Sequence, residues 1–329
     1  MHRVSRLPAG CLVLVGPTAS GKTALLDELF GSVDSRKTRG LPEAEVVSAD
    51  SMQAYRGMDI GTAKPDAALR SRLPHRLIDI LDPREQYTTG DFVRLADAAC
   101  AEIAAAGRLP VVSGGTGFYV RNFICGLPAA PPADPALRAR VAADLSSSGE
   151  AALRAELTAI DPDSAARIHR NDLYRLTRAV EVVRATGRPL ADFAAPTRAR
   201  PGYRFGVVGV TRDRAELDAR VDARVDAMLE AGLAEEVAAL AAAGCGPGAP
   251  GMKAIGYREF FDPESGGSAS GEAIDLGAVA RAIKQDTRHY AKRQMTFFRA
   301  LPGIKWIAPS ADELASELGD IVQGGASAI

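Results

Sequence analysis

The sequence predicts an α/β protein in which an all-helical domain interrupts a parallel-sheet core. Short apolar runs alternate with helical patterns over the first part of the chain, as in parallel sheets whose strands are buried on both faces. This alternation stops at residue 127, and no strand-like run returns until after residue 202. A glycine-rich turn separates the first apolar run from the first helical pattern. We therefore predict a discontinuous α/β core, residues 1–127 and 203–329, and a helical insertion, residues 128–202.

Each element of this fold has its own signal in the sequence. Apolar runs predict strands at residues 11–15, 45–50, 75–81, 109–115, 205–210 and 304–308. Amphipathic patterns predict core helices at residues 22–30, 91–107 and 278–299. Within the insertion, helical patterns cover residues 135–145 and 173–187. Residues 31–44 carry neither pattern strongly and are expected to form an extended loop.

The composition excludes several classes of function. The 329 residues carry a net charge of −1, so a nucleic-acid partner would need a local basic surface. No apolar run approaches the roughly 20 residues of a membrane span, and no cleavage-site pattern follows the N-terminus, so we expect a cytoplasmic protein without a membrane partner. Nothing in the sequence implies a protein partner. The cysteines form no CxxC pair, which argues against a zinc or redox site: Cys11, Cys100, Cys125 and Cys245.

The glycine-rich turn fits the phosphate-binding pattern G-x-x-x-x-G-K-[ST]. It comprises Gly16, Pro17, Thr18, Ala19, Ser20, Gly21, Lys22 and Thr23. Between a strand and a helix, such a turn points backbone N–H groups at an anion, and the helix N-terminus adds positive potential. Lys22 would add a mobile charge, and the Thr23 hydroxyl would join a Mg²⁺ shell. The predicted core is therefore P-loop NTPase-like and binds a di- or triphosphate; a glycine turn without a ligand is the alternative.

Asp50 follows the second predicted strand. It is therefore expected at the carboxyl edge of the sheet, where open α/β sheets bind their ligands. From this position alone, Asp50 can hold a metal ion or act as a general base, and both roles stay open. Thr116 lies in a glycine-rich turn after the fourth strand and faces the same edge; a simple glycine turn that ends the strand is the alternative.

Several segments, taken in order, closely resemble the bacterial tRNA dimethylallyltransferases. They are GPTASGKT, SADSMQAYRGMDIGTAKP, PHRLIDILDP, GGTGFYV, KAIGYRE and DTRHYAKRQMTFFR. The resemblance extends from about residue 11 to residue 305, and the second and last segments are far more specific than the phosphate-binding turn. Arg76 departs from the family pattern, which has a second histidine there. The C-terminal zinc finger of eukaryotic relatives is absent from this sequence.

The resemblance implies an activity. Members of the family transfer a dimethylallyl group from dimethylallyl pyrophosphate to N6 of the adenosine beside the anticodon of tRNA. In this sequence the resemblance assigns Asp50 as the base that takes the amine proton, and Thr116 as a contact near the reacting centre. Lys22, the amides of the turn and Mg²⁺ on Thr23 would stabilise the charge of the departing pyrophosphate.

The resemblance also implies a set of tRNA contacts. They are Asp50, Ser51, Met52, Gln53, Arg138, Tyr174, Arg175, Leu176, Thr177 and Arg178. Arg175 and Arg178 share one face of a predicted helix, although such a pair alone is typical of a solvated surface. No RRM or KH signature occurs, so recognition is expected to rest on shape, phosphates and an extruded base.

A basic stripe follows the predicted helix 278–299. Its members are Arg281, Lys284, Arg288, Lys292 and Arg299, and the opposite side carries Ile283, Tyr290 and Phe297. The apolar side is expected to face the core and the basic side to face RNA, with Arg288 and Lys292 as contacts. A solvated basic face without a partner is the alternative.

Three further basic residues have an open role. Arg220 and Arg224 lie four positions apart on one predicted helix and can bind a pyrophosphate. Acidic neighbours on the same helix make surface ion pairs equally consistent with the sequence; they are Asp218, Asp222 and Asp226. Lys253 is the first residue of the segment KAIGYRE, and the sequence alone leaves its role open.

Three other functions fit parts of the sequence. An adenylate isopentenyltransferase would use the same donor on a free nucleotide, but it would not need the insertion or the basic helix. A P-loop small-molecule kinase would leave the second and last family segments unexplained. A non-catalytic RNA-binding module would not need an intact Lys22-Thr23 pair together with Asp50.

Overall fold

The computed structural model describes residues 10–131, 134–268 and 274–322. The chain divides into two compact units, one formed by Met1–Ile124 with Arg198–Ile329 and the other by Cys125–Thr197. The second unit covers most of the region expected as the insertion, 128–202, and begins and ends slightly earlier. Residues 1–9, which entered the expectation about targeting, lie outside the described range.

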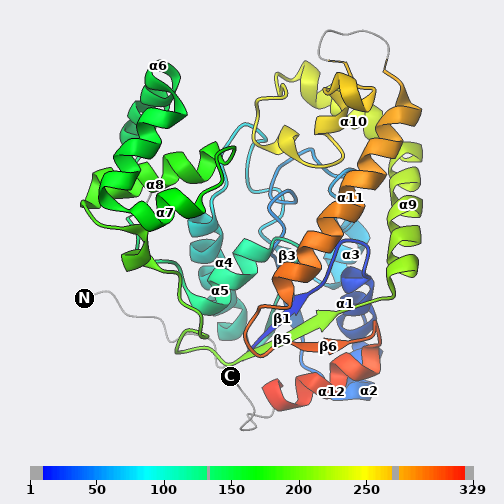
Figure 1. The fold of residues 1–329 in the computed structure, drawn as a ribbon. Helices are drawn as coiled ribbons and strands as arrows, with labels where there is room; N and C mark the ends of the chain where they lie inside the picture. Colours follow the sequence, from blue (N-terminus) through cyan, green and yellow to red (C-terminus); the bar gives the residue numbers. More distant parts are fainter. Residues whose placement is uncertain (1–9, 132–133, 269–273, 323–329) are drawn as a thin grey trace. The chain divides into compact units, whose positions relative to one another are not determined.

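The first unit is built on a parallel sheet with the strand order β3-β2-β4-β1-β5-β6 (Figure 1). The strands are β1 (Cys11–Val15), β2 (Ala44–Ser48), β3 (His75–Arg76), β4 (Leu109–Gly114), β5 (Phe205–Val210) and β6 (Lys305–Ile307). All neighbouring strands pair in parallel, and Val13 of β1 lies between Val112 of β4 and Val207 of β5. The predicted α/β fold is confirmed. Because the strands run the same way, the residues that follow β1, β2 and β4 meet at one edge of the sheet.

β3 is much shorter than the predicted strand 75–81. Only His75 and Arg76 pair with β2. Leu77 and Asp79 have left-handed backbone angles, with φ of 63° and 58°, and a strand cannot continue through such residues. The Arg76 guanidinium lies 2.8 Å from the carboxylate of Glu45, whose side chain is only 3% exposed. The residue that departs from the family pattern therefore neutralises a buried carboxylate.

Helices pack on this sheet and on one another. They are α1 (Lys22–Phe30), α2 (Val33–Arg39), α3 (Ala67–Arg72), α4 (Thr89–Ala105), α5 (Gly117–Cys125), α9 (Arg214–Glu230), α10 (Leu233–Ala242), α11 (Leu276–Phe298) and α12 (Ala311–Val322). Short 3₁₀ turns complete the unit: η2 (Gly251–Lys253), η3 (Arg258–Phe260) and η4 (Pro263–Ser265). The long helices α9 and α11 contact each other (Figure 1).

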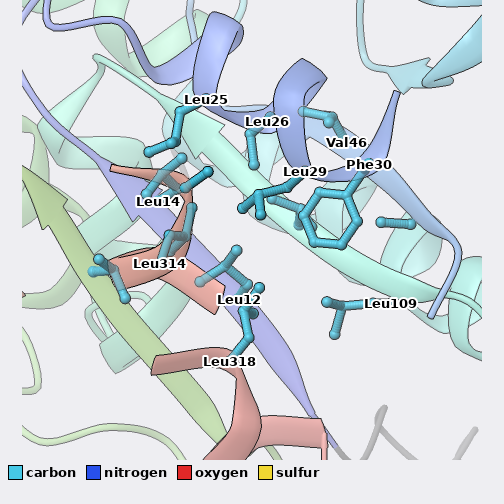
Figure 2. Packing of buried hydrophobic residues seen from close by; sticks show 14 of the residues in the cluster. Leu12, Leu14, Leu25, Leu26, Leu29, Phe30, Val46, Leu109, Leu314 and Leu318 are labelled. Carbon is cyan, nitrogen blue, oxygen red and sulfur yellow. The ribbon is translucent and has the colours of Figure 1, made fainter. Parts of the chain in front are cut away.

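One apolar cluster joins the central strand to the helices that cover it. Leu12 and Leu14 of β1 pack with Leu29 and Phe30 of α1 and with Leu314 of α12 (Figure 2). These side chains are almost completely buried, and burying each contributes about 1.5–3 kcal/mol. The cluster therefore fixes α1, and with it the phosphate-binding turn that precedes α1, against the sheet.

Residues 31–44 are not one extended loop, so that prediction is wrong. They contain α2, which begins after Ser32 and ends at Gly40. The Ser32 hydroxyl accepts a hydrogen bond from the amide of Ser35 at 3.0 Å, and Gly40 has the left-handed φ of 63° that ends many helices. Because α2 is short and has no buried residue, its sequence carries no apolar periodicity.

The second unit is helical over its described residues. It contains α6 (Pro135–Ile160), α7 (Pro162–Arg167), α8 (Leu173–Thr186) and η1 (Leu190–Phe193). A core of its own joins α6 and α8 through Leu137, Leu157, Leu176 and Val180. Gly149 interrupts α6 with a φ of 78°.

No helix in the described part of the chain is long and apolar enough to cross a membrane. All four cysteines are buried thiols.

Candidate functional site

A cavity of about 940 Å³ opens at the carboxyl edge of the sheet. The turn after β1, the segment after β2 and the turn after β4 form one side, and α9, the stretch around η2 and α11 form the other. All of these segments belong to the first unit. The cavity thus lies where an open parallel sheet is expected to bind its ligand.

The phosphate-binding turn forms the floor of this cavity. Gly21 has a left-handed φ of 98° where α1 begins, and a side chain at Gly16 would lie 2.8 Å from the carbonyl oxygen of Val210. The Lys22 ammonium donates hydrogen bonds to the carbonyl oxygens of Gly16 at 2.8 Å and Pro17 at 3.0 Å. Lys22 and the turn amides therefore surround a space in which an anion can bind.

Arginines that follow β5 bond this turn or line the cavity beside it. The Nε of Arg220 donates to the carbonyl oxygen of Ala19 at 2.9 Å, and the Nε of Arg212 donates to that of Ser20 at 2.8 Å. Arg220 and Arg224 both line the cavity, so the structure brings them to the phosphate-binding turn. No local pattern indicates Arg212, because only the pairing of β5 with β1 brings it there.

Burial shifts the protonation of the cationic groups in the cavity. Burial and the nearby charge of Arg224 lower the pKa of Lys22 to about 8, and the Asp50 carboxylate opposes this shift. Burial also lowers the pKa of Arg224, again opposed by Asp50. The carboxylate, the ammonium and the guanidinium therefore act on one another electrostatically within one site.

The structure brings Asp50 and Thr116 to the same edge. Asp50 accepts a hydrogen bond from the amide of Met52 at 2.9 Å. The Thr116 hydroxyl accepts from the amide of Ser51 at 3.0 Å and donates to the Ser51 hydroxyl at 3.2 Å. The ends of β2 and β4 approach closely, since a side chain at Gly114 would collide with the backbone of Ala49.

The segment between Asp50 and Pro65 is held by a dense set of hydrogen bonds. Gln53 accepts from the Ser48 hydroxyl at 2.9 Å and donates to the carbonyl oxygen of Thr62 at 3.3 Å. The Lys64 ammonium, 3% exposed, lies 2.6 Å from Asp79. Glu236 of α10 accepts from successive backbone amides, those of Asp59, Ile60 and Gly61. This wall of the cavity is therefore preorganised before any substrate binds.

α11 closes the other wall with residues that the sequence analysis missed. The buried Gln294 accepts from the amide of Thr18 at 2.8 Å and donates to the carbonyl oxygen of Gly115 at 2.8 Å. Tyr290 donates to the same carbonyl at 3.3 Å. Burial and the charge of Asp50 raise the pKa of Tyr290 to about 12. Gln294 thus links the turn after β1 to the turn after β4.

The basic stripe of α11 does not face solvent along its whole length. Arg288 forms an ion pair with Asp222 of α9, and Lys284 lies 2.6 Å from Asp226 of α9. These aspartates are the acidic neighbours that the sequence suggested as partners of Arg220 and Arg224. Lys292 is exposed, as are Arg281 and Arg299 at either end of the stripe.

Lys253 is exposed and does not line the cavity, although the neighbouring Ala254 does.

The predicted tRNA contacts of the second unit have different environments. Arg138 and Arg178 both pair with Glu181, at 3.2 and 3.1 Å, and the Glu181 side chain is 5% exposed. Leu176 is completely buried, whereas Tyr174 is 77% exposed. Arg175 is exposed and pairs with Asp172, and the Thr177 hydroxyl donates to the carbonyl oxygen of Tyr174. Tyr174 and Arg175 are thus the most exposed members of the set, ahead of Arg138, whose side chain is 49% exposed.

A metal ion at this site would need ligands from more than protein carboxylates. Within the described residues, no group of three or more histidine, cysteine, aspartate or glutamate side chains could hold one. Thr23 and Asp50, which line the same cavity, supply the hard oxygen ligands that divalent cations prefer.

Fold and site together define an α/β protein with a P-loop-like turn after β1 and a carboxylate, that of Asp50, after β2, both lining one cavity. Residues 53–301 match the family described as IPP transferase, and the chain belongs to that family.

Named relatives are similar in sequence to this chain over nearly its full length. A tRNA dimethylallyltransferase of Anaeromyxobacter sp. is 44% identical over 306 residues, which are 92% of this chain and 97% of the relative. One of Geobacter sulfurreducens is 42% identical over 297 residues, 90% of this chain and 91% of the relative.

Solved structures also resemble this chain. The full-length tRNA isopentenylpyrophosphate transferase of Bacillus halodurans has a TM-score of 0.65 and 36% identity, with 96% of each chain covered. A eukaryotic dimethylallyltransferase acting on tRNA has a TM-score of 0.76, 96% of this chain and 80% of that chain covered, and 22% identity, which supports the fold alone.

Proposed function

We propose that this enzyme transfers a dimethylallyl group from dimethylallyl pyrophosphate to N6 of the adenosine beside the anticodon of tRNA, and that it does so in the cytoplasm. The observation that carries the proposal is that one cavity is lined both by the phosphate-binding turn and by Asp50, next to which Ser51 is bonded to the Thr116 hydroxyl. A prenyl donor needs the phosphate-binding turn for its pyrophosphate, and an amine acceptor needs Asp50 and Thr116.

The turn after β1 binds the pyrophosphate of the donor. Lys22 leaves the carbonyl oxygens of Gly16 and Pro17 and pairs with the phosphate oxygens, and Arg220 and Arg224 add charge from α9. These cationic groups stabilise the pyrophosphate more strongly as the C–O bond breaks, because the leaving pyrophosphate then gains negative charge. The donor half of the reaction is therefore stabilised electrostatically.

Asp50 acts on the acceptor. The exocyclic amine of adenine is a poor nucleophile because its lone pair is delocalised into the ring. As the new N–C bond forms, the Asp50 carboxylate takes the amine proton, and pyrophosphate leaves with the electron pair of the broken C–O bond. The hydrogen bond from Met52 orients the carboxylate, and the Thr116 hydroxyl contacts the acceptor beside the reacting nitrogen.

Mg²⁺ fits this site through the Thr23 hydroxyl together with the oxygens of the donor. It prefers a few protein oxygens combined with substrate phosphates and water, and this cavity offers that set. When bound, it would neutralise charge on the departing pyrophosphate.

RNA is the proposed acceptor rather than a free nucleotide. The exposed Lys292 in the first unit and the exposed Tyr174 and Arg175 in the second are accessible to a large acceptor. Asp50, Ser51, Met52 and Gln53 would meet the extruded adenosine at the cavity. An acceptor as small as AMP would use none of the surface residues, so a free-nucleotide enzyme leaves them unexplained.

Labelled dimethylallyl pyrophosphate, incubated with the enzyme and either tRNA or AMP, tests the proposal. We expect label in tRNA and none in AMP, with the Asp50→Asn variant as the control for catalysis at this site. Label in AMP alone would establish the free-nucleotide alternative. Transfer of a labelled phosphate from ATP to a small molecule, without prenyl transfer, would establish a kinase.

A further inference from the structure

Two phenylalanines, one exposed and one half-buried, form an aromatic pair on segments next to the cavity. Phe118, in the first turn of α5, is 57% exposed. Its ring centroid lies 5.0 Å from that of Phe297, in the last turn of α11, and the two ring planes meet at 57°. Both residues belong to the first unit. Exposing a phenylalanine ring to water costs free energy that its burial would avoid, so the position of this pair needs an explanation.

The local backbone makes room for this pair. A side chain at Gly117 would lie 2.5 Å from the ring of Phe297, so only glycine allows that ring to lie across the start of α5. On its other side, Phe297 contacts the ring of Phe298, which is completely buried. Phe297 is therefore fixed between a core residue and an exposed one, and it orients Phe118 toward solvent.

Both rings are carried by segments that close the active-site cavity. Phe118 lies two residues after Thr116, whose hydroxyl contacts Ser51. Phe297 lies one helical turn after Gln294, which bonds the carbonyl oxygen of the cavity residue Gly115. The pair is thus rigidly connected to the place where the target adenine must enter.

The surroundings of the pair are cationic. The last turns of α11, from Thr287 to Phe298, contain no acidic residue, and Lys292, Arg293 and Arg299 are exposed. Aromatic faces beside lysine and arginine are the combination with which proteins bind unpaired nucleotides, because the rings stack on bases and the cations meet phosphates.

We propose that Phe118, supported by Phe297, stacks on an unpaired base of the RNA loop that flanks the adenosine being modified. The inference rests on the proposed function, since it requires an RNA acceptor. Extrusion of the target base leaves its neighbour without a stacking partner, and the Phe118 ring supplies a replacement face. Phe118 is a positioning residue, because it acts on the flanking nucleotide and not on the reacting atoms.

RNA affinity of Phe118→Leu and Phe118→Tyr tests this role. A stem–loop RNA that contains the target adenosine serves as ligand. We expect Phe118→Leu to weaken binding by about 5-fold or more, the lower end of the range for base–aromatic stacking, and Phe118→Tyr to restore it. The salt dependence of binding should stay the same, because stacking releases no counterions. The KM for dimethylallyl pyrophosphate should also stay the same.

A double-mutant cycle identifies the base. The loop nucleotides next to the target are replaced one at a time by an abasic site. For one of them, loss of the base should weaken binding to the wild-type protein as much as Phe118→Leu does, and should have no further effect on the variant. Additive losses at every position, or a Phe118→Leu variant that binds like the wild type, would overturn the proposed stacking on Phe118.

Two controls separate the causes of a negative result. Val33→Ala removes an exposed apolar side chain of α2 and should leave RNA affinity unchanged. If Val33→Ala weakens binding as much as Phe118→Leu, the loss of affinity is not specific to Phe118 and the inference fails. A wild-type protein that neither binds nor modifies the stem–loop overturns the proposed function itself. Normal modification without coupling between Phe118 and any loop base overturns only the stacking role of Phe118.

Discussion

At the scale of single residues, Asp50 has a clearly defined geometry. One carboxylate oxygen accepts a hydrogen bond from the amide of Met52, and the charges of Lys22 and Arg224 are close enough to interact with it. In the proposed mechanism, this arrangement orients the carboxylate while the cationic groups bind the donor. A substitution at Asp50 should therefore separate catalysis from donor binding.

Asp50→Asn keeps the size of the side chain but removes the proton acceptor. We expect turnover to fall by about a hundred- to ten-thousandfold, the usual contribution of a general base. Affinity for dimethylallyl pyrophosphate should change little. Single-turnover kinetics with saturating tRNA measure the first quantity, and donor binding at equilibrium measures the second. Turnover within a few-fold of the wild type would show that another group takes the proton.

Lys22 predicts a pH dependence of donor binding. Its pKa is lowered from 10.5 to about 8, so the ammonium is charged below this pH and loses its proton as the pH rises through it. The KM for dimethylallyl pyrophosphate should therefore rise above about pH 8. The same shift makes the folded protein gain stability between about pH 8 and 10.5, where the unfolded chain binds more protons.

Arg224→Gln tests the cause of this pH dependence. The charge of Arg224 is one of the causes that lower the pKa of Lys22, so its removal should move the rise in KM to higher pH. Affinity for the donor should also fall at every pH, because a cation has been lost. An unchanged midpoint in the KM profile would mean that Arg224 does not influence Lys22.

At the scale of helices, α9 and α11 are joined by ion pairs that use part of the basic stripe. Arg288 is occupied by Asp222, whereas Lys292 is exposed one turn further along. The two residues were equivalent in the sequence, because the helical pattern of α11 alone does not indicate which aspartates face it. The structure therefore assigns them different expected effects on RNA binding.

Lys292→Ala should flatten the dependence of tRNA affinity on salt. Each phosphate contact contributes roughly 0.7 to 0.9 to the log–log slope, so the slope should decrease by about one. Arg288→Ala should leave the slope nearly unchanged. Titrations of tRNA binding over a range of salt concentrations measure both. An equal decrease in the two variants would indicate that Arg288 exchanges Asp222 for a phosphate when RNA binds.

The second unit depends on the pairing of Glu181 with Arg138 and Arg178. Glu181→Gln removes the charge that both guanidinium groups share. We expect the free energy of unfolding to fall by about 1–2 kcal/mol, because the arginines remain partly solvated after the change. Chemical denaturation of this unit measures the loss. The matched control is Asp172→Asn, which breaks the exposed pair with Arg175 and should cost less than about 0.5 kcal/mol.

The sequence predicted some elements well because their signals are local. The strands 11–15 and 205–210 and the helix 22–30 have the observed bounds, since each combines a periodic pattern with a clear end. The contact between Gln294 and Thr18 spans 276 positions, and no local pattern reveals it. The strand 75–81 was overextended because the left-handed residues Leu77 and Asp79 are neither glycine nor asparagine.

At the scale of the whole molecule, donor chemistry and part of the proposed RNA contacts belong to different units. Every residue that lines the cavity lies in the first unit, whereas Tyr174 and Arg175 lie in the second. We expect the double substitution Tyr174→Ala with Arg175→Ala to weaken tRNA binding by about fivefold or more. The KM for the donor should not change. A change in donor KM alone would contradict an RNA role for these residues.

The position of β1 in the sheet has a consequence for synthesis of the chain. β1 pairs with β5, but the ribosome completes the entire second unit before residues 205–210 emerge. Until then, one edge of β1 has unpaired amides and carbonyls, and nascent segments of this kind are prone to aggregate. The phosphate-binding turn has to wait still longer, because its partner Gln294 lies in α11 and emerges well after β5. The nascent chain can therefore fold its helical unit early, while the cavity at the sheet edge forms only after α11 has emerged.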